Sequence, residues 1–357
     1  MKYRLSKFFA RSGYAANTTI VIDLNMINAI SNIIIWLEAM NSQQIMTASP
    51  CACISKIELV DGSDVLYSLN GYEAEALDWY HNKGQFRANY NVALNGQRIE
   101  KVFAINFGRW LWDQNWAFDP QRFGNPQLRI SLDIAAGGNA ASDNYITCFA
   151  NMFDEVTPSL QGFLMSKQIK THAIASGTHY YTDLPLDYPY RALYYRTHAV
   201  ALEASWLLAN LKLSEDQDRK IPIDVTGIDL VRCLQESYPP VKESFFHESN
   251  TINKYLYHAA CQWVTAFATR WANTGTTAAM ACYAGEGGRL ETIASAIENY
   301  QVDVKGWIPH GVFEVPFGRK DDPSDAYDIR GLGSLRSDMT GGNTGTASIF
   351  LQQYRPY

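Results

Sequence analysis

The sequence lacks the short motifs that mark the common classes of enzyme. It contains no G-x-S-x-G elbow, no phosphate-binding loop and no H-E-x-x-H pair, and Gly285 to Leu290 lacks the last glycine of a dinucleotide fingerprint. Its seven histidines include no His-x-His or His-x-x-x-His pair, so the sequence lacks the ligand pattern of a cupin-type metal site. The acidic clusters Asp61 to Asp64 and Asp321 to Asp325 are more typical of turns than of calcium sites. We therefore predict no catalytic residues, no cofactor and no metal.

Long apolar runs are also missing. Asn28, Ser31 and Asn32 interrupt the richest stretch, residues 26–40, which leaves no membrane-spanning segment of about 18 residues or more. The first residues lack the continuous apolar segment of a secretion signal. The six cysteines form no C-x-x-C pair and have no regular spacing, which favours buried, reduced thiols in a protein made in a cytoplasm.

Charged residues are scarce, at 18% of the 357 residues, and the net charge is −6. A negative chain is a poor candidate for binding nucleic acid, because phosphate binding requires clustered Lys and Arg. A surface with little charge indicates protein contacts, and the 21 Tyr and 9 Trp indicate the same, although many of them belong to β-cores.

The first residues are the local exception to this charge balance. They combine basic side chains with two aromatic ones, and no acidic residue precedes Asp23. Such an arm suits an anionic lipid surface or a nucleic acid; the alternative is a solvated, disordered terminus. The residues of this predicted contact are Lys2, Arg4, Lys7, Phe8, Phe9 and Arg11.

The two halves of the chain repeat one pattern in the same order. Val-Phe-x-x-x-Phe-Gly-Arg at residues 102–109 returns at residues 312–319, and the later matches keep an offset that shrinks only from 210 to 204. A collinear series of this kind indicates two copies of one domain. The matched residues are Phe107, Gly108 and Arg109 with Phe317, Gly318 and Arg319, then Asp119 with Asp328, Leu128 with Leu335, Asp133 with Asp338, and Gly137 to Asn139 with Gly341 to Asn343.

The repeated blocks indicate a β-domain. Between Gln127 and Ala135 apolar and polar residues alternate, which is the period of a half-buried strand, and a Gly-Gly-Asn turn follows. Asn70 and Glu73 form a predicted capping box before one short helix over residues 74–80. What recurs is typical of packing and turns, and a catalytic site is rarely kept in both copies.

The repeat divides the chain into a basic arm (residues 1–17), a first domain (18–165), a linker (166–190) and a second domain (191–357). Prolines in Thr182 to Tyr190 suit a rigid linker.

A weaker match extends the repeat upstream, and beyond it the offset jumps by about 45 residues. It pairs Gly62, Asp64 and Leu69 with Gly227, Asp229 and Leu234. The jump predicts an insertion over about residues 236–300 of the second copy. Apolar residues at helical spacing predict two helices there, on Ile252, Leu256, Ala260, Trp263 and Phe267 and on Leu290, Ile293, Ile297 and Tyr300.

Two fused β-domains, the block Ile57 to Gly71 leading into a short helix, and Phe-Gly-Arg followed by Asp and a Leu-Arg strand resemble the double jelly-roll major capsid proteins of the tectivirus and adenovirus lineage. Relatives occur in small membrane-containing bacteriophages such as corticoviruses and finnlakeviruses. The resemblance covers residues 18–357 and implies an all-β fold of two eight-stranded jelly rolls, with the insertion forming a tower on the outer capsid face.

The resemblance also implies a function. The chain would be a non-enzymatic major capsid protein, whose pseudo-hexameric homotrimers tile an icosahedral virion. Its partners would be itself, penton and minor capsid proteins and an internal lipid membrane next to the basic arm, without specific nucleic acid. It would be made in the host cytoplasm. Two alternatives remain open: a two-jelly-roll hydrolase of the glycosidase or glycoamidase type with paired carboxylates between its domains, and a carbohydrate-binding or receptor-binding β-protein.

Overall fold

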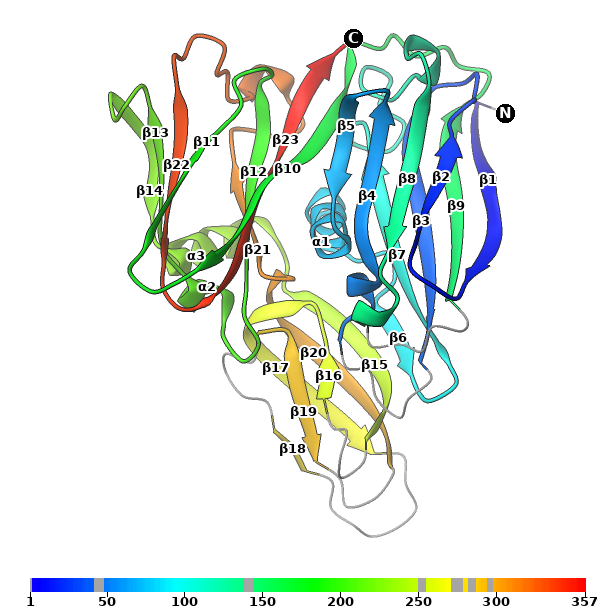
Figure 1. Cartoon of the computed structure of the whole chain (residues 1–357), viewed down its shortest axis with the longest axis vertical. Helices are drawn as coiled ribbons and strands as arrows, with labels where there is room; N and C mark the ends of the chain where they lie inside the picture. Colours follow the sequence, from blue (N-terminus) through cyan, green and yellow to red (C-terminus); the bar gives the residue numbers. More distant parts are fainter. Residues whose placement is uncertain are drawn as a thin grey trace.

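The computed structural model describes residues 2–41, 48–137, 144–249, 255–270, 279–281, 287–293 and 298–357. In this part of the chain two β-sandwiches lie side by side, and a third group of strands projects from one end (Figure 1). Both termini lie at the opposite end, away from the projection (Figure 1). The described residues contain no helix long and apolar enough to cross a membrane.

The first sandwich packs two four-stranded sheets face to face. One sheet has the order β1 (Tyr3–Tyr14), β9 (Asn144–Phe153), β3 (Ile30–Met40) and β7 (Arg98–Asn106). The other has the order β2 (Thr18–Asp23), β8 (Pro126–Leu132), β4 (Ile54–Asp61) and β5 (Asp64–Leu69). Strand β8 shows why these segments form strands, because Leu128, Ile130 and Leu132 alternate with polar residues and point into the core.

The second sandwich repeats the first strand for strand. Its first sheet has the order β10 (Gly162–Ile174), β23 (Gly345–Pro356), β12 (Tyr190–His198) and β21 (Val312–Pro316). Its second sheet has the order β11 (His179–Asp183), β22 (Leu335–Gly341), β13 (Leu208–Glu215) and β14 (Lys220–Val225). The same order built from successive segments confirms the predicted all-β fold of two eight-stranded jelly rolls.

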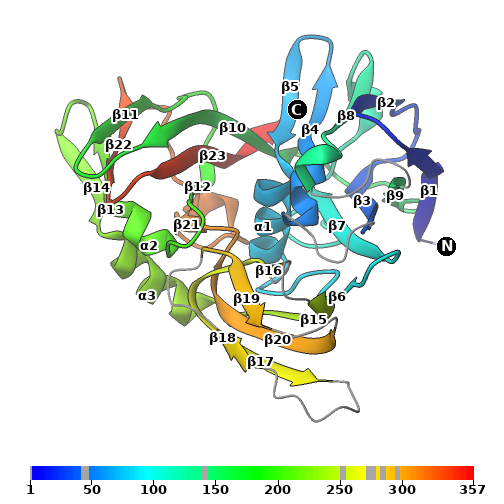
Figure 2. The same cartoon turned by 60° about the horizontal axis from the view of Figure 1, so that its bottom comes forward.

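A parallel pairing joins the two sandwiches. Ser166 and Lys167 of β10 pair with Tyr67 and Ser68 of β5, so two four-stranded sheets become one eight-stranded sheet. Figure 2 shows β10 and β23 reaching toward the first sandwich, with helix α1 (Gly71–His81) between the two halves. One continuous cluster of buried apolar residues therefore runs through both sandwiches.

The helices begin where the sequence places side-chain caps. Asn70 and Glu73 form the predicted capping box of α1. Thr226 and Asp229 form the equivalent box of α3 (Gly227–Ser237). A four-residue helix, α2 (Ala204–Leu207), and the 3-10 turns η1 (Pro50–Cys53), η2 (Pro120–Arg122), η3 (Ala135–Gly137) and η4 (Pro323–Asp325) complete the helical elements of the described residues.

These caps correct one part of the predicted repeat. Gly62 lies in the turn between β4 and β5, whereas Gly227 begins a helix and corresponds to Gly71. The shared Gly-x-Asp spacing serves a hairpin turn in one copy and a capping box in the other. Asp133 and Asp338 also differ, because Asp133 follows β8 and Asp338 lies inside β22. Gly138 and Asn139 lie outside the described residues.

The two helices predicted in the insertion are wrong for its described residues. This segment forms β15 (Val241–Ser249), β16 (Tyr255–Tyr257), β17 (Ala260–Arg270), β18 (Ala279–Ala281), β19 (Arg289–Ile293) and β20 (Glu298–Pro309). Leu256 and Ala260 are buried, but Trp263 is 40% and Phe267 69% exposed, so the apolar residues at helical spacing do not share a buried face. A bulge between Gln262 and Thr265 breaks the alternation that would have indicated a strand. Ile252 and Ile297 lie outside the described residues.

The strands of this segment make two sheets, which we call the projection. One has the order β17-β20-β15-β6, and the other has the order β16-β19-β18. Strand β6 (Tyr90–Ala93) comes from the first copy and pairs in parallel with β15, so both copies contribute to the projection.

Two further boundaries need correction. Residues 3–14 of the predicted arm form β1, an edge strand paired along its length with β9. Residues 166–190, predicted as a linker, hold most of β10 and all of β11. Neither segment shows the strict alternation of a half-buried strand, because polar residues stand together in it, as Ser166 to Gln168 do in β10.

Candidate functional site: the repeated corner and the seam between the sandwiches

The repeated Phe-Gly-Arg blocks form the same corner in both sandwiches. Phe107 follows β7 and stacks on Phe118 with ring centroids 5.0 Å apart. Phe317 follows β21 and stacks on Tyr327 at 4.6 Å. Paired backbone hydrogen bonds join Phe118 to Ile30 and Tyr327 to Tyr190, at the starts of β3 and β12. The repeat thus marks a buried aromatic corner.

Glycine and arginine have matching tasks in each corner. A Cβ added to Gly108 would lie 2.5 Å from the carbonyl oxygen of Trp116, which is too close for any other residue type. A Cβ added to Gly318 would lie 2.4 Å from the carbonyl oxygen of Asp325, and the φ of Gly318, +61°, also favours glycine. Arg109 holds Asp113 across its loop with Nε and Oδ2 2.6 Å apart. Arg319 holds Asp325 in the same way at 2.7 Å.

The other repeated residues also lie on corresponding elements. Asp119 accepts a hydrogen bond from the Gln121 N–H, and Asp328 accepts one from the Arg330 N–H, each directly after the bridged aromatic residue. Leu128 lies in β8 and Leu335 begins β22, but their predicted match is wrong by two residues. The Leu335 carbonyl accepts from the Leu184 N–H as the Pro126 carbonyl accepts from the Leu24 N–H, so Leu335 corresponds to Pro126. Both leucines are buried in the shared core.

Of the basic residues near the N-terminus, Arg4, Lys7 and Arg11 lie on the edge strand β1, and Lys2 directly precedes it. Lys2, Arg4 and Lys7 are exposed. Arg11 forms a bidentate pair with Glu38 at 2.7 Å for both bonds, and its guanidinium lies 3.4 Å from the centre of the Tyr145 ring. Phe8 and Phe9 are partly buried against the core. The six residues therefore do not form one exposed surface. Arg11 binds Glu38 and Tyr145 of its own sandwich.

Helix α1 lines the seam between the sandwiches with three buried carboxylates, Glu73, Glu75 and Asp78. Glu73 accepts hydrogen bonds from Gln168 of β10 and Ser348 of β23, so the N-terminus of the helix is bonded to the second sandwich. Burial raises the pKa of Glu73. Burial also raises the pKa of Asp78, although Arg87 pairs with it at 2.8 Å.

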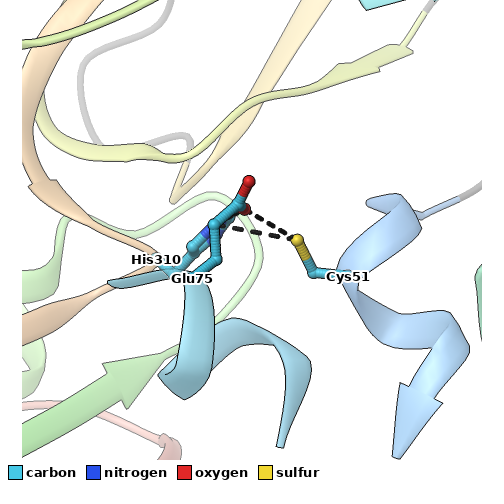
Figure 3. Close-up of side chains that lie close together, drawn as sticks. All are labelled: Cys51, Glu75 and His310. Atoms are coloured by element: carbon cyan, nitrogen blue, oxygen red, sulfur yellow. Dashed lines mark hydrogen bonds and ion pairs between the residues drawn. The ribbon is translucent and has the colours of Figure 1, made fainter. Parts of the chain in front are cut away.

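Glu75 is the centre of a buried polar cluster in the seam, and Figure 3 shows it with Cys51 and His310. Its Oε2 accepts a hydrogen bond from the Cys51 thiol at 2.8 Å and lies 2.6 Å from His310 Nε2. Its Oε1 lies 3.2 Å from the Lys101 ammonium, which also pairs with Glu243 at 2.9 Å. All five side chains are buried. We call this set the seam cluster.

Electrostatics within the seam cluster follow from its burial. Burial alone would raise the pKa of Glu75, but the Lys101 ammonium and the His310 hydrogen bond outweigh it and lower this pKa. Burial would lower the pKa of Lys101, but Glu243 and Glu75 outweigh it and raise this pKa. Burial and the adjacent Glu75 charge raise the pKa of the Cys51 thiol.

A second buried carboxylate, Glu314 of β21, extends this polar layer. It accepts hydrogen bonds from the Tyr194 hydroxyl at 2.8 Å and the Tyr238 hydroxyl at 2.6 Å, and it pairs with Lys320. Burial lowers the pKa of Lys320 to about 8 despite the attraction of Glu314. Each of these seam carboxylates thus has a hydrogen-bond or ion-pair partner and is shielded from solvent. This arrangement suits a fixed joint between the sandwiches, whereas a hydrolytic site must admit water and substrate.

Exposed apolar side chains mark the outer surface of the second sandwich and the projection. Trp263 N–H donates to Glu203 and Ser205 N–H donates to the Gln262 side chain, so β17 lies next to α2. The exposed residues of this region are Val200, Trp206, Trp263 and Phe267. Exposed aromatic side chains of this kind are typical of protein contacts.

The described cysteines are all free thiols, and Cys233 alone among them is exposed. The sequence pattern did not reveal the seam cluster, because its members lie up to 259 residues apart in the chain. The one available signal was the acidic content of α1, where Glu73 belongs to the capping box and Glu75 and Asp78 follow it in the same short helix.

No protein-family model matches the sequence, and no curated protein matches it. Solved structures do match. The major capsid protein of Sulfolobus turreted icosahedral virus is similar with a TM-score of 0.63 and 15% identity, over 100% of this chain and 98% of that one. The major capsid protein P2 of bacteriophage PM2 is similar with a TM-score of 0.58 and 10% identity, and the match covers 99% of this chain and 98% of that one. VP54 of PBCV-1 is similar with a TM-score of 0.59 and 10% identity, and the match covers 99% of this chain and 93% of that one. The chain therefore has the double jelly-roll fold of viral major capsid proteins.

Proposed function

We propose that this protein is a major capsid protein whose homotrimers tile an icosahedral virion. One observation carries the proposal: two sandwiches with the same strand order are fused side by side through a shared eight-stranded sheet. Three such chains around a threefold axis present six similar sandwiches, and this outline can repeat across a flat lattice. The full-length likeness to capsid proteins of separate viruses supports it.

The seam supports the same role. A capsid subunit must keep its two sandwiches in a fixed relation, since its neighbours contact both. Here β5 pairs with β10, the Tyr357 hydroxyl donates to the Ala117 carbonyl at 2.6 Å, and Arg355 pairs with Asp64. These contacts leave the two sandwiches little freedom to rotate. Penton and minor capsid proteins would meet the outer edges of this rigid unit.

The enzymatic alternative is less well supported. A hydrolase needs two carboxylates that face a substrate and a water molecule. The seam carboxylates of the described residues face partners inside the protein instead, as Glu75 and Glu314 illustrate. A carbohydrate-binding or receptor-binding role remains compatible with the exposed aromatic residues, and the experiment below separates it from assembly.

The purified protein is expected to have about three times the 40.2 kDa mass of one chain, and electron microscopy is expected to show hexagonal particles. Replacing the exposed Phe267 by Ser should reduce assembly into larger shells several-fold without changing the circular dichroism spectrum. Thr265→Ser, at a neighbouring exposed position on β17, is the matched control. A monomer that forms no assemblies at any concentration would contradict the proposal.

We further propose that the exposed basic residues near the N-terminus, Lys2, Arg4 and Lys7, face the virion interior and contact lipid or a neighbouring subunit. The N-terminus lies at the end of the molecule opposite the projection (Figure 1). Each basic residue near an anionic surface contributes about 1 kcal/mol, so three act together.

Changing Lys2, Arg4 and Lys7 together to Ser should therefore weaken binding to anionic vesicles at least tenfold and lower particle yield. Arg11 is kept, since its removal would break the pair with Glu38. Lys56→Ser, at an exposed position on β4, serves as the charge control. Normal particles together with unchanged vesicle binding would show that these residues are only solvated.

A further inference from the structure

Three side chains of metal-ligating type meet in the seam cluster: Cys51 of η1, Glu75 of α1 and His310, which follows β20. Their ligand atoms all lie within 4.8 Å of one another, and all three residues are buried (Figure 3). We propose that this trio binds a divalent zinc ion that joins the two sandwiches.

The chemistry of the three donors favours zinc. A thiolate, an imidazole and a carboxylate are the donor types found in protein zinc sites, whereas calcium and magnesium prefer oxygen donors alone. Complete burial in the folded protein excludes bulk water from these donors. The ligands come from segments far apart in the chain, so the site forms only when both sandwiches are in place.

Charge balance permits the ion. Glu75 and Glu243 carry two negative charges and Lys101 one positive charge, so these three groups sum to −1. Zn²⁺ would bind Cys51 Sγ, His310 Nε2 and a Glu75 carboxylate oxygen; the Zn–S bond replaces the S–H bond of Cys51, and that proton is released to solvent. With a thiolate and a neutral imidazole as ligands, the ion, Cys51, Glu75, Glu243 and Lys101 together carry no net charge. A buried cluster with no net charge avoids the cost of an uncompensated ion.

The geometry requires only a small local change. Zinc holds its ligands at about 2.0–2.3 Å, which places ligand atoms roughly 3.2–3.7 Å apart. The Cys51 Sγ to His310 Nε2 distance is 3.8 Å. Glu75 Oε2 lies closer, 2.6 Å from Nε2 and 2.8 Å from Sγ, so its carboxylate must move outward by about 1 Å as the hydrogen-bonded protons leave.

A cavity next to His310 offers room for a fourth ligand. Ser49, His258, Cys261 and His310 line it. His258 is buried beside this cavity. A water molecule in the cavity would complete a tetrahedral site.

The test is metal content and spectroscopy on the full chain at about pH 8, where thiols ionise more readily. Protein stripped with a chelator, given zinc chloride and dialysed should hold about one zinc ion per chain. Cobalt(II) should give the sulfur-to-metal absorption of a thiolate site. Cys51→Ser and His310→Gln should each lower zinc affinity about 100-fold or more.

Cys233→Ser and His179→Gln change an exposed cysteine and an exposed histidine and should bind zinc as the wild type does. Unaltered wild-type protein without the cobalt absorption band would overturn the proposal, whether or not the variants fold. So would zinc binding that survives both ligand substitutions. Trimer mass is measured on the same samples, and because the site lies within one chain, loss of zinc binding leaves the capsid role untouched.

Discussion

Lys101→Met is expected to destabilise the folded protein by about 3–5 kcal/mol, the largest effect of any single charge removal in the described seam. Lys101 is the shared counter-ion of Glu75 and Glu243, with its ammonium 3.2 Å and 2.9 Å from their carboxylates. Methionine has a similar length but no charge, so two carboxylates would remain buried without it. Urea unfolding followed by tryptophan fluorescence, with a chelator present, measures the change.

Two further variants make this test specific. Adding Glu243→Gln to Lys101→Met removes one of the stranded charges and should recover part of the loss. Lys56→Met breaks a surface pair with Glu58 and should change stability by less than about 1 kcal/mol. If Lys101→Met cost no more than Lys56→Met, the seam cluster would contribute little to the joint between the sandwiches.

Phe107→Ala and Phe317→Ala are each expected to cost about 3–5 kcal/mol, because each removes a buried ring and leaves a cavity in the aromatic corner. Phe107 is 1% exposed and Phe317 is 9% exposed, so Phe317→Ala should lie at the lower end of this range. Thermal and denaturant unfolding of the purified variants give both values.

Phe267→Ala is the matched control for this pair, since its ring is 69% exposed and its removal opens no cavity. It should leave the unfolding midpoint unchanged within error. A loss at Phe107 with none at Phe317 would mean that the two corners share their geometry but not their contribution to stability.

The sequence was sufficient for the parts of the fold that depend on local geometry. Phe-Gly-Arg recurs because each corner needs a buried ring, a residue without a Cβ and an arginine that holds its own loop. The capping box at Asn70 likewise begins a helix from four neighbouring residues. Such requirements are the same wherever the segment lies, so they can be read without knowing the rest of the molecule.

Features that depend on distant contacts were not predictable in this way. Trp263 and Phe267 are spaced like a helical face, but β20 and β15 give their segment a sheet to pair with. Lys7 and Arg11 suggested a free arm, but β9 supplies hydrogen bonds that make their segment a strand. The seam cluster has no spacing rule at all, because its members meet only after both sandwiches have formed.

Strand β23 has a consequence for how the protein is made. It covers Gly345–Pro356, after every other strand of the second sandwich in the sequence, yet it lies between β10 and β12. During synthesis β10 and β12 therefore emerge well before the strand that joins them, and this sheet cannot close until β23 has been made. The first half closes earlier, since β9 ends at Phe153. Vectorial synthesis thus sets the order of folding, and it delays completion of the second half, and any assembly that needs it, until β23 has emerged from the ribosome.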